Sequence, residues 1–112
     1  MPEKVVCHED EIEKEICTDR WSKNLVGTAD IRTTSGFSIG VAVYTEPEFG
    51  ERQRHEDQEA VYVLSGVGEI LIGEETYPVG PGTAAYIGPG VVHATRRTGE
   101  EPVKLLYAHG AL

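Results

Sequence analysis

The chain from residue 25 onward consists of short apolar or alternating stretches, each followed by turn residues. Stretches of about four to eight residues bounded by glycine, proline or acidic residues are typical of β-strands. We predict strands at 4–6, 29–33, 37–44, 53–55, 59–64, 69–72, 76–79, 84–87, 92–96 and 103–108. Strands this short and closely spaced leave no room for βαβ units and predict an all-β sandwich or barrel.

Residues 1–24 have a different pattern, acidic and without regular apolar spacing. Residues 8–16 favour either one or two helical turns or a solvated acidic turn. We expect Trp21 to pack against the edge of the core. The pattern divides the chain into a leader, 1–24, and a single barrel domain, 25–112.

The strand at 37–44 alternates clearly, and one of its faces is apolar. The residues of that face are Phe37, Ile39, Val41 and Val43. Because alternate side chains of a strand point to opposite faces, we expect this face to line the barrel. Val43, with Val63 on the next long strand, is then a candidate for contact with a small substrate.

Composition narrows the class of protein. A chain of 112 residues with 39% hydrophobic and 26% charged residues is typical of one globular domain. The formal net charge of -9 repels phosphate backbones and anionic lipid, so we expect neither a nucleic-acid nor a membrane partner. No apolar run approaches the roughly 20 residues of a membrane span, and the acidic N-terminus does not resemble a signal peptide. We therefore expect a cytoplasmic protein, with Cys7 and Cys17 as free thiols.

Two of the four histidines, His55 and His93, lie beside predicted turns. His55 precedes Glu59 by four residues across a predicted turn, and His93 follows the Gly88-Pro89-Gly90 turn. Two imidazoles and one carboxylate on strand ends suit Fe(II), Mn(II) or Zn(II) with open positions. The same spacing is compatible with surface or core histidines beside a solvated glutamate. We expect His109, near the C-terminus, to be exposed.

Two segments around these residues resemble the conserved motifs of the cupin family. Residues 59–66 with Gly68 match the first motif, in which a glutamate is followed by six residues and a glycine. Residues 82–93 match the second, with Gly90 and His93 at the family's offsets from Gly82. The short spacer between the motifs resembles the small single-domain bacterial cupins. The resemblance covers about residues 36–108.

The resemblance implies a jelly-roll barrel (a double-stranded β-helix) with a metal in its mouth. Glu59, His55 and His93 fall on ligand positions of the family. The position of its first histidine is occupied by Gln53, whose amide oxygen is a weaker, neutral donor. Gln53 therefore ligates the metal, hydrogen-bonds a metal-bound water, or leaves the position open to substrate.

Further departures from the family pattern are Pro47 for its leading glycine, Gly88 for a proline and Arg97 for an asparagine. Arg97 shares its strand parity with His93 and Thr95. If Arg97 points inward, a bidentate contact favours an anionic substrate such as a carboxylate, with Thr95 beside it. The alternative is a solvent-facing Arg97 near the acidic residues that follow it.

The function that the resemblance implies is a metal-dependent enzyme on a small, anionic organic substrate. Dioxygenase, isomerase, lyase and decarboxylase chemistry all remain open, with Fe, Mn, Zn or Ni as the metal. Glu59 serves either as a ligand or, when displaced, as a base. The alternative is a non-catalytic module that binds or senses a metal or metabolite. Exposed strand edges at 4–6 and 29–33 lead us to expect a homodimer.

Overall fold

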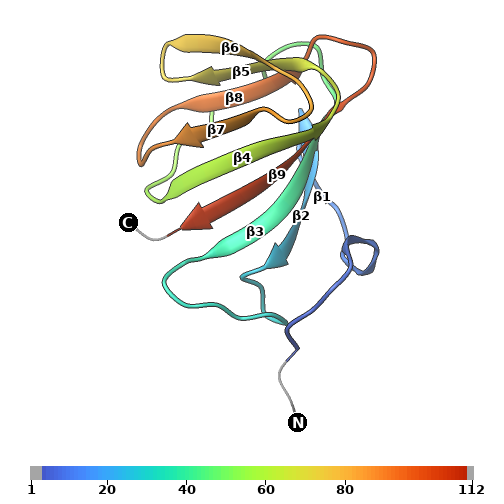
Figure 1. Cartoon of the computed structure of the whole chain (residues 1–112), viewed down its shortest axis with the longest axis vertical. Helices are drawn as coiled ribbons and strands as arrows, with labels where there is room; N and C mark the ends of the chain where they lie inside the picture. Colours follow the sequence, from blue (N-terminus) through green and yellow to red (C-terminus); the bar gives the residue numbers. More distant parts are fainter. Residues whose placement is uncertain (1–3, 111–112) are drawn as a thin grey trace.

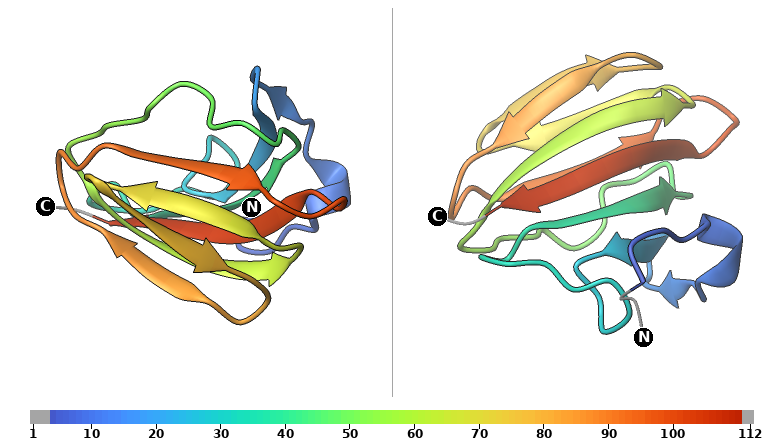
Figure 2. Two further views of the ribbon diagram at one scale, coloured as in Figure 1. Left: turned by 90° about the horizontal axis from the view of Figure 1, so that it is seen from above. Right: turned by 60° about the horizontal axis from the view of Figure 1, so that its bottom comes forward.

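The computed structural model describes residues 4–110, which form two antiparallel sheets. Figure 1 and the two turned views in Figure 2 show these sheets as layers on either side of a shared interior. The six-stranded sheet has the order β1-β2-β3-β9-β4-β7, and the three-stranded sheet has the order β6-β5-β8. The bounds are β1 Glu15–Ile16, β2 Arg20–Val26, β3 Ser38–Tyr44, β4 Gln58–Ser65, β5 Gly68–Ile72, β6 Glu75–Val79, β7 Ala84–Ile87, β8 His93–Arg97 and β9 Val103–Gly110. The all-β prediction is confirmed.

The core lies between the sheets and draws on both of them. Its buried members are Ala42, Tyr44, Val61, Val63, Ile70, Val79, Ile87, Val103 and Leu105. On β4, buried and exposed positions alternate, so that Val61 and Val63 point inward. The glycine after β4 is required by its surroundings. Gly66 has φ +81°, and a Cβ there would lie 2.1 Å from the Pro102 carbonyl oxygen.

The prediction that the face containing Val41 and Val43 lines the barrel is wrong. Ala42 and Tyr44, of opposite parity, belong to the interior cluster. Val41 and Val43 are nonetheless buried, at 3% and 7% exposed, on the outer face of the sheet. Both faces of β3 are thus covered, and apolar residues on both faces hide which one is interior. Val43 consequently lies on the opposite side of the sheet from the barrel interior.

Residues 9–11 lie over this outer face. A 3-10 turn, η1 (Glu9–Glu11), is fixed by two lysines: Lys23 Nζ donates to the Glu9 carbonyl at 2.7 Å, and Lys104 Nζ lies 2.9 Å from Glu9 Oε1. Lys23 is the register partner of Val41, and Lys104 that of Val43. Glu9 is therefore held over β3 from both neighbouring strands.

The N-terminal third of the chain departs from the predicted strands. Residues 4–6 and 29–33 are not strands, so those two predictions are wrong. Instead β1 and β2 extend the six-stranded sheet, and β2 spans residue 24, where we had ended the leader. Of the two alternatives for 8–16, helical turns or a solvated acidic turn, the structure has one 3-10 turn, η1.

Both cysteines are free, as expected. Within residues 4–110, no helix has the length and apolar character needed to cross a membrane. The cytoplasmic location stays a prediction.

Candidate metal centre

Three imidazoles and one carboxylate converge in the space between the sheets. His55 comes from the loop before β4, Glu59 from β4, His93 from the first position of β8 and His109 from the end of β9. Glu59 and His109 are register partners in the ladder between β4 and β9. His93 is fixed by a backbone bridge in which it exchanges two 2.9 Å hydrogen bonds with Gln53. The strands therefore bring together groups that are distant in the sequence.

The imidazole nitrogens surround the Glu59 carboxylate. The Nε2 atoms of His55 and His93 lie 3.0 and 3.4 Å from Glu59 Oε1. His109 Nε2 lies 3.7 Å from Glu59 Oε2. Two atoms that each bind one metal ion at about 2.0–2.2 Å lie roughly 3–3.5 Å apart. Nitrogen and carboxylate donors at this spacing fit a divalent transition metal.

Burial and hydrogen bonding within the cluster shift the pKa values of two of its members. Glu59 is 8% exposed and His93 is 5% exposed. Burial lowers the pKa of His93, but hydrogen bonds with Glu59 and the Val91 carbonyl outweigh it, so the pKa is raised above its usual range. Burial likewise raises the pKa of Asp57, but His109 and His55 outweigh it and the pKa is lowered. The cluster thus pairs the buried Glu59 and the half-buried Asp57 with imidazoles.

A cavity of about 200 Å³ adjoins the cluster. It is lined by Glu15, Arg20, Ser22, Asn24, Ala42, Tyr44, Gln53, Glu59, Leu105, Tyr107 and His109. Burial raises the pKa values of Tyr44 and Tyr107 to about 12, so both hydroxyls stay protonated at neutral pH. Arg20 is the cation of this wall, with Nη1 2.8 Å from Asp19 Oδ1.

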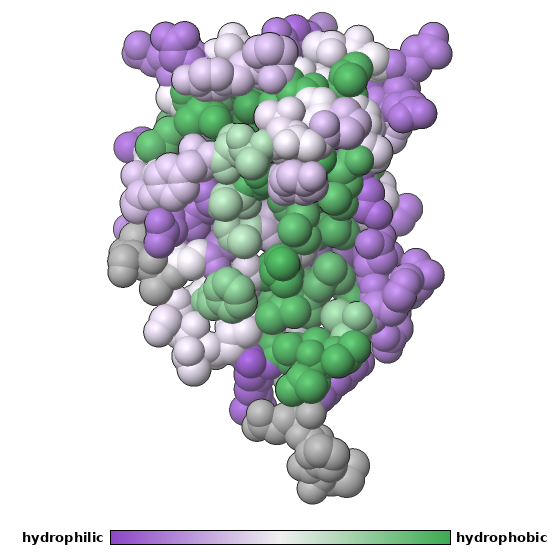
Figure 3. Space-filling view, viewed as in Figure 1, coloured by the Kyte–Doolittle hydropathy of each residue, from purple (hydrophilic) through white to green (hydrophobic). Residues whose placement is uncertain are grey.

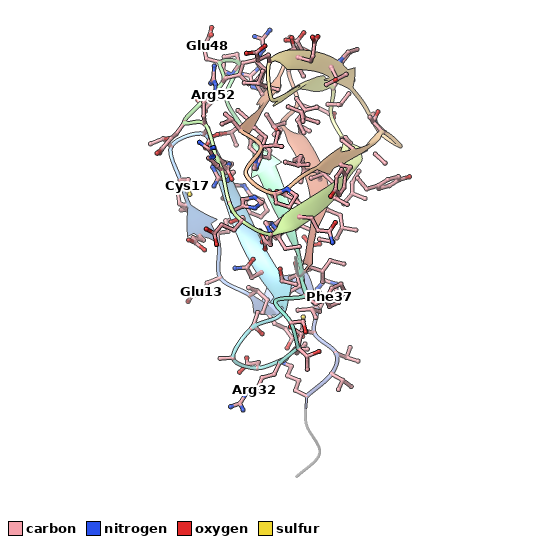
Figure 4. The ribbon with its side chains drawn as sticks, turned by 90° about the vertical axis from the view of Figure 1, so that its left-hand side faces the viewer. Glu13, Cys17, Arg32, Phe37, Glu48 and Arg52 are labelled. Atoms are coloured by element: carbon pink, nitrogen blue, oxygen red, sulfur yellow. The ribbon has the colours of Figure 1, made fainter. Side chains whose placement is uncertain are left out.

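Arg20 and Gln53 also border a second opening of about 360 Å³, formed by residues 17–20 and 51–55. Cys17 and Arg52 on its rim are labelled in Figure 4. The neighbouring donors fix which end of the Gln53 amide is the oxygen. This oxygen accepts hydrogen bonds from Arg20 Nη1 at 3.0 Å and Nη2 at 3.3 Å. The Gln53 oxygen therefore already has a donor.

The other predicted site residues are spread over the molecule. Arg97 donates from Nε to the Thr45 carbonyl and from Nη1 to the Gly99 carbonyl, both at 2.8 Å. Its guanidinium ties two loops rather than pairing with a carboxylate. Thr95 is buried in β8, and Val63 lies in the core. Of the predicted set, His55, Glu59 and His93 meet, and Gln53 lines the adjoining cavity.

Sequence reasoning missed two residues of the site. His109 is half-buried against Glu59, so the expectation that it is exposed is wrong. The alternation of Val103, Leu105, Tyr107 and His109 along the last strand was the available signal. Arg20 gave no such signal, because only its pairing with Tyr44 across β2 and β3 brings it to the cavity.

Fold and site together define a β jelly-roll barrel with a histidine and carboxylate cluster inside it. The family model described as the cupin domain matches residues 41–109, more than half of the chain. The chain belongs to the cupin family.

Curated relatives match parts of the chain. An L-ectoine synthase of Vibrio atlanticus is 35% identical over 63% of this chain and 55% of its own length. A mannose-1-phosphate guanylyltransferase of Salmonella typhimurium is 32% identical over 59% of this chain and 14% of its own length. The chain thus spans about half of one relative and a small part of the other.

Solved structures share the fold. A predicted oxalate decarboxylase of Thermotoga maritima superposes with a TM-score of 0.82 at 18% identity, covering 96% of this chain and 100% of that chain. At this identity the likeness confirms the cupin-like jelly-roll fold and no more.

Proposed function

We propose that the chain is a metal-dependent enzyme of cupin type that acts on a small, anionic organic substrate. The observation that carries this proposal is the convergence of imidazole Nε2 atoms on the buried Glu59 carboxylate at 3.0 and 3.4 Å. His55, Glu59 and His93 would hold the metal. Imidazole and carboxylate donors suit Fe, Mn, Zn and Ni alike, so the donor set leaves the metal open among these four.

The metal, when bound, supplies a Lewis acid that polarises an oxygen of the substrate. Glu59 is the group that would hold or move a proton. It is buried among imidazoles, and only one of its oxygens lies within 3.4 Å of His55 and His93. A carboxylate that leaves the metal on substrate binding can accept a proton from a C–H or O–H bond.

We assign the contact with an anionic substrate to Arg20 rather than Arg97. Arg20 lines the cavity beside Glu59, and Arg97 is not among the residues that line this cavity. A guanidinium presents several donors to a carboxylate in a planar fork. The neutral hydroxyl of Tyr44, on the same wall, supplies a further donor.

The experiment is metal analysis of the protein after loading with Fe(II), Mn(II), Zn(II) or Ni(II) and removal of free metal. We expect about one equivalent in the wild type and loss of it in E59Q. E56Q is the matched control, because Glu56 lies in the same turn but is exposed. A wild type that holds none of these metals would overturn the proposal and favour a metal-free metabolite-binding barrel.

We further propose that the chain forms a homodimer through the outer face of the six-stranded sheet. Figure 3 shows hydrophobic side chains gathered along this face, in the view of Figure 1. Tyr62 and Leu64 on β4 are 45% and 43% exposed there. A second copy would cover them. Light scattering should give about 24 kDa for the wild type and less for L64E, whereas a 12 kDa wild type would contradict the dimer.

A further inference from the structure

Asp57 lies behind two of the imidazoles, on the side away from Glu59. Its Oδ1 is 2.6 Å from His55 Nδ1, and its Oδ2 is 3.1 Å from His109 Nδ1. One carboxylate therefore accepts from two rings, one oxygen to each. Asp57 stands between His55 and Glu59 in the sequence, in the turn that starts β4.

This contact determines which nitrogen of each ring is available. A carboxylate only accepts, so the ring nitrogen bonded to Asp57 keeps a proton, and the nitrogen from which a metal ion can displace a proton is the other one. For His55 and His109 the remaining nitrogen is Nε2, the atom that faces Glu59. His93 follows the same rule through the Val91 carbonyl, 3.0 Å from its Nδ1.

His109 also faces the Glu59 carboxylate, with its Nε2 3.7 Å from the second oxygen, Oε2. It is the register partner of Glu59, and its ring centroid lies 4.7 Å from that of His55. One ligand atom from each of His55, Glu59 and His109 falls within a mutual separation of 4.8 Å. A metal near Glu59 is thus within reach of His109.

Gln53 is not placed in this way. Its amide oxygen accepts from Arg20, and the residue is tied to His93 through the backbone. Gln53, which occupies the position of the motif's first histidine, therefore has its amide oxygen already hydrogen-bonded to Arg20.

We infer that His109, from the last strand, supplies the third imidazole of the metal centre in place of Gln53, and that Asp57 orients His55 and His109 together. This inference rests on the metal site of the proposed function and completes its ligand set. Asp57 is a positioning residue: it acts on the metal only through the two rings.

The test is titration of the metal-free protein with cobalt(II). Isothermal titration calorimetry measures the affinity for cobalt, and the visible absorption spectrum reports the ligands around the bound ion. Circular dichroism of each metal-free variant checks that it folds. H109A should lose at least about 10-fold in affinity and change the absorption spectrum. D57N should lose roughly 10- to 100-fold, the range for groups that orient metal ligands. Q53A and the control E56Q should stay within about twofold of the wild type.

Failure of the inference is distinct from failure of the proposed function. A wild type that binds no cobalt overturns both. A wild type that binds cobalt while H109A keeps its affinity and spectrum overturns the third ligand only. If Q53A loses cobalt affinity and H109A does not, His109 is not the third ligand and Gln53 is. Wild-type affinity in D57N overturns the orienting role of Asp57.

Discussion

Strands β3 and β4 are the two neighbours of β9 in the same sheet, yet they are buried differently. On β4, buried and exposed positions alternate from Gln58 to Leu64. On β3, every position from Gly40 to Tyr44 is buried. The inner face of both strands meets the core. The difference lies on the outer face, which η1 covers over β3 and leaves open over β4.

The comparison shows what alternation can and cannot establish. Alternation reveals that a strand has two different faces. On β4 one face is exposed, so the other face, which carries Glu59, is the inner one. On β3 both faces are apolar, so the correct face depends on where the leader packs. The leader packs through lysines on β2 and β9, which no local pattern of β3 contains.

A leucine-to-alanine substitution should destabilise the fold far more on the inner face of the sheet than on its outer face. L105A removes a core side chain that is 2% exposed and should lower the free energy of unfolding by about 2–5 kcal/mol. L64A, on the open outer face of β4, should lower it by less than about 1 kcal/mol when both are measured at a protein concentration low enough for the chain to be monomeric. Urea unfolding of the metal-free proteins measures both. Equal losses would contradict the assignment of faces.

Glu59 is the polar residue on the inner face of β4, and its contribution to stability should depend on metal. If Glu59 holds a metal, free metal at about 100 times its Kd should raise the free energy of unfolding by about 2.7 kcal/mol. E59Q should show little of this gain, and chelation should abolish it in the wild type. Thermal melts with and without metal supply the measurement. A gain in E59Q equal to that of the wild type would exclude Glu59 as a ligand.

The outer face of β3 gives the third prediction. V43A should lower the free energy of unfolding by about 1–2.5 kcal/mol, because Val43 is only 7% exposed on the outer face of β3. Cobalt affinity should stay at the wild-type value, since Val43 faces away from the metal centre. Loss of affinity without loss of stability would restore Val43 to the inner face.

The smallest effect concerns the attachment of the leader. The hydrogen bond from Lys104 lowers the pKa of Glu9, so this pair stabilises the fold above the usual pKa of a glutamate. The contribution is lost as the pH falls through the lowered pKa. E9Q should therefore cost less than about 1 kcal/mol at pH 7 and nothing at strongly acidic pH.

Glu13 is the matched control for this last prediction. It is an exposed acid of the same leader, labelled in Figure 4. E13Q should have no effect at either pH. A loss in E9Q that persisted at strongly acidic pH would show that Glu9 acts through something other than its charge.

Much of the barrel was predictable, because the strands from β3 to β9 are short, apolar and separated by glycine-rich turns. The β2 sequence, RWSKNLV, mixes polar and apolar residues without alternation, so its pairing with β3 was missed. At the site, motif spacing identified His55, Glu59 and His93. His109 and Arg20 were missed because they reach the cavity through pairing between strands, which spacing does not encode.

Anomalous diffraction from crystals of the cobalt-loaded protein would locate the metal ion relative to Glu59 and the imidazoles. We expect one strong peak between the sheets, about 2.0–2.2 Å from His55 Nε2, His93 Nε2 and a Glu59 oxygen. A peak bound only by carboxylates of the acidic leader, or no peak beside Glu59, would contradict a metal centre in this barrel.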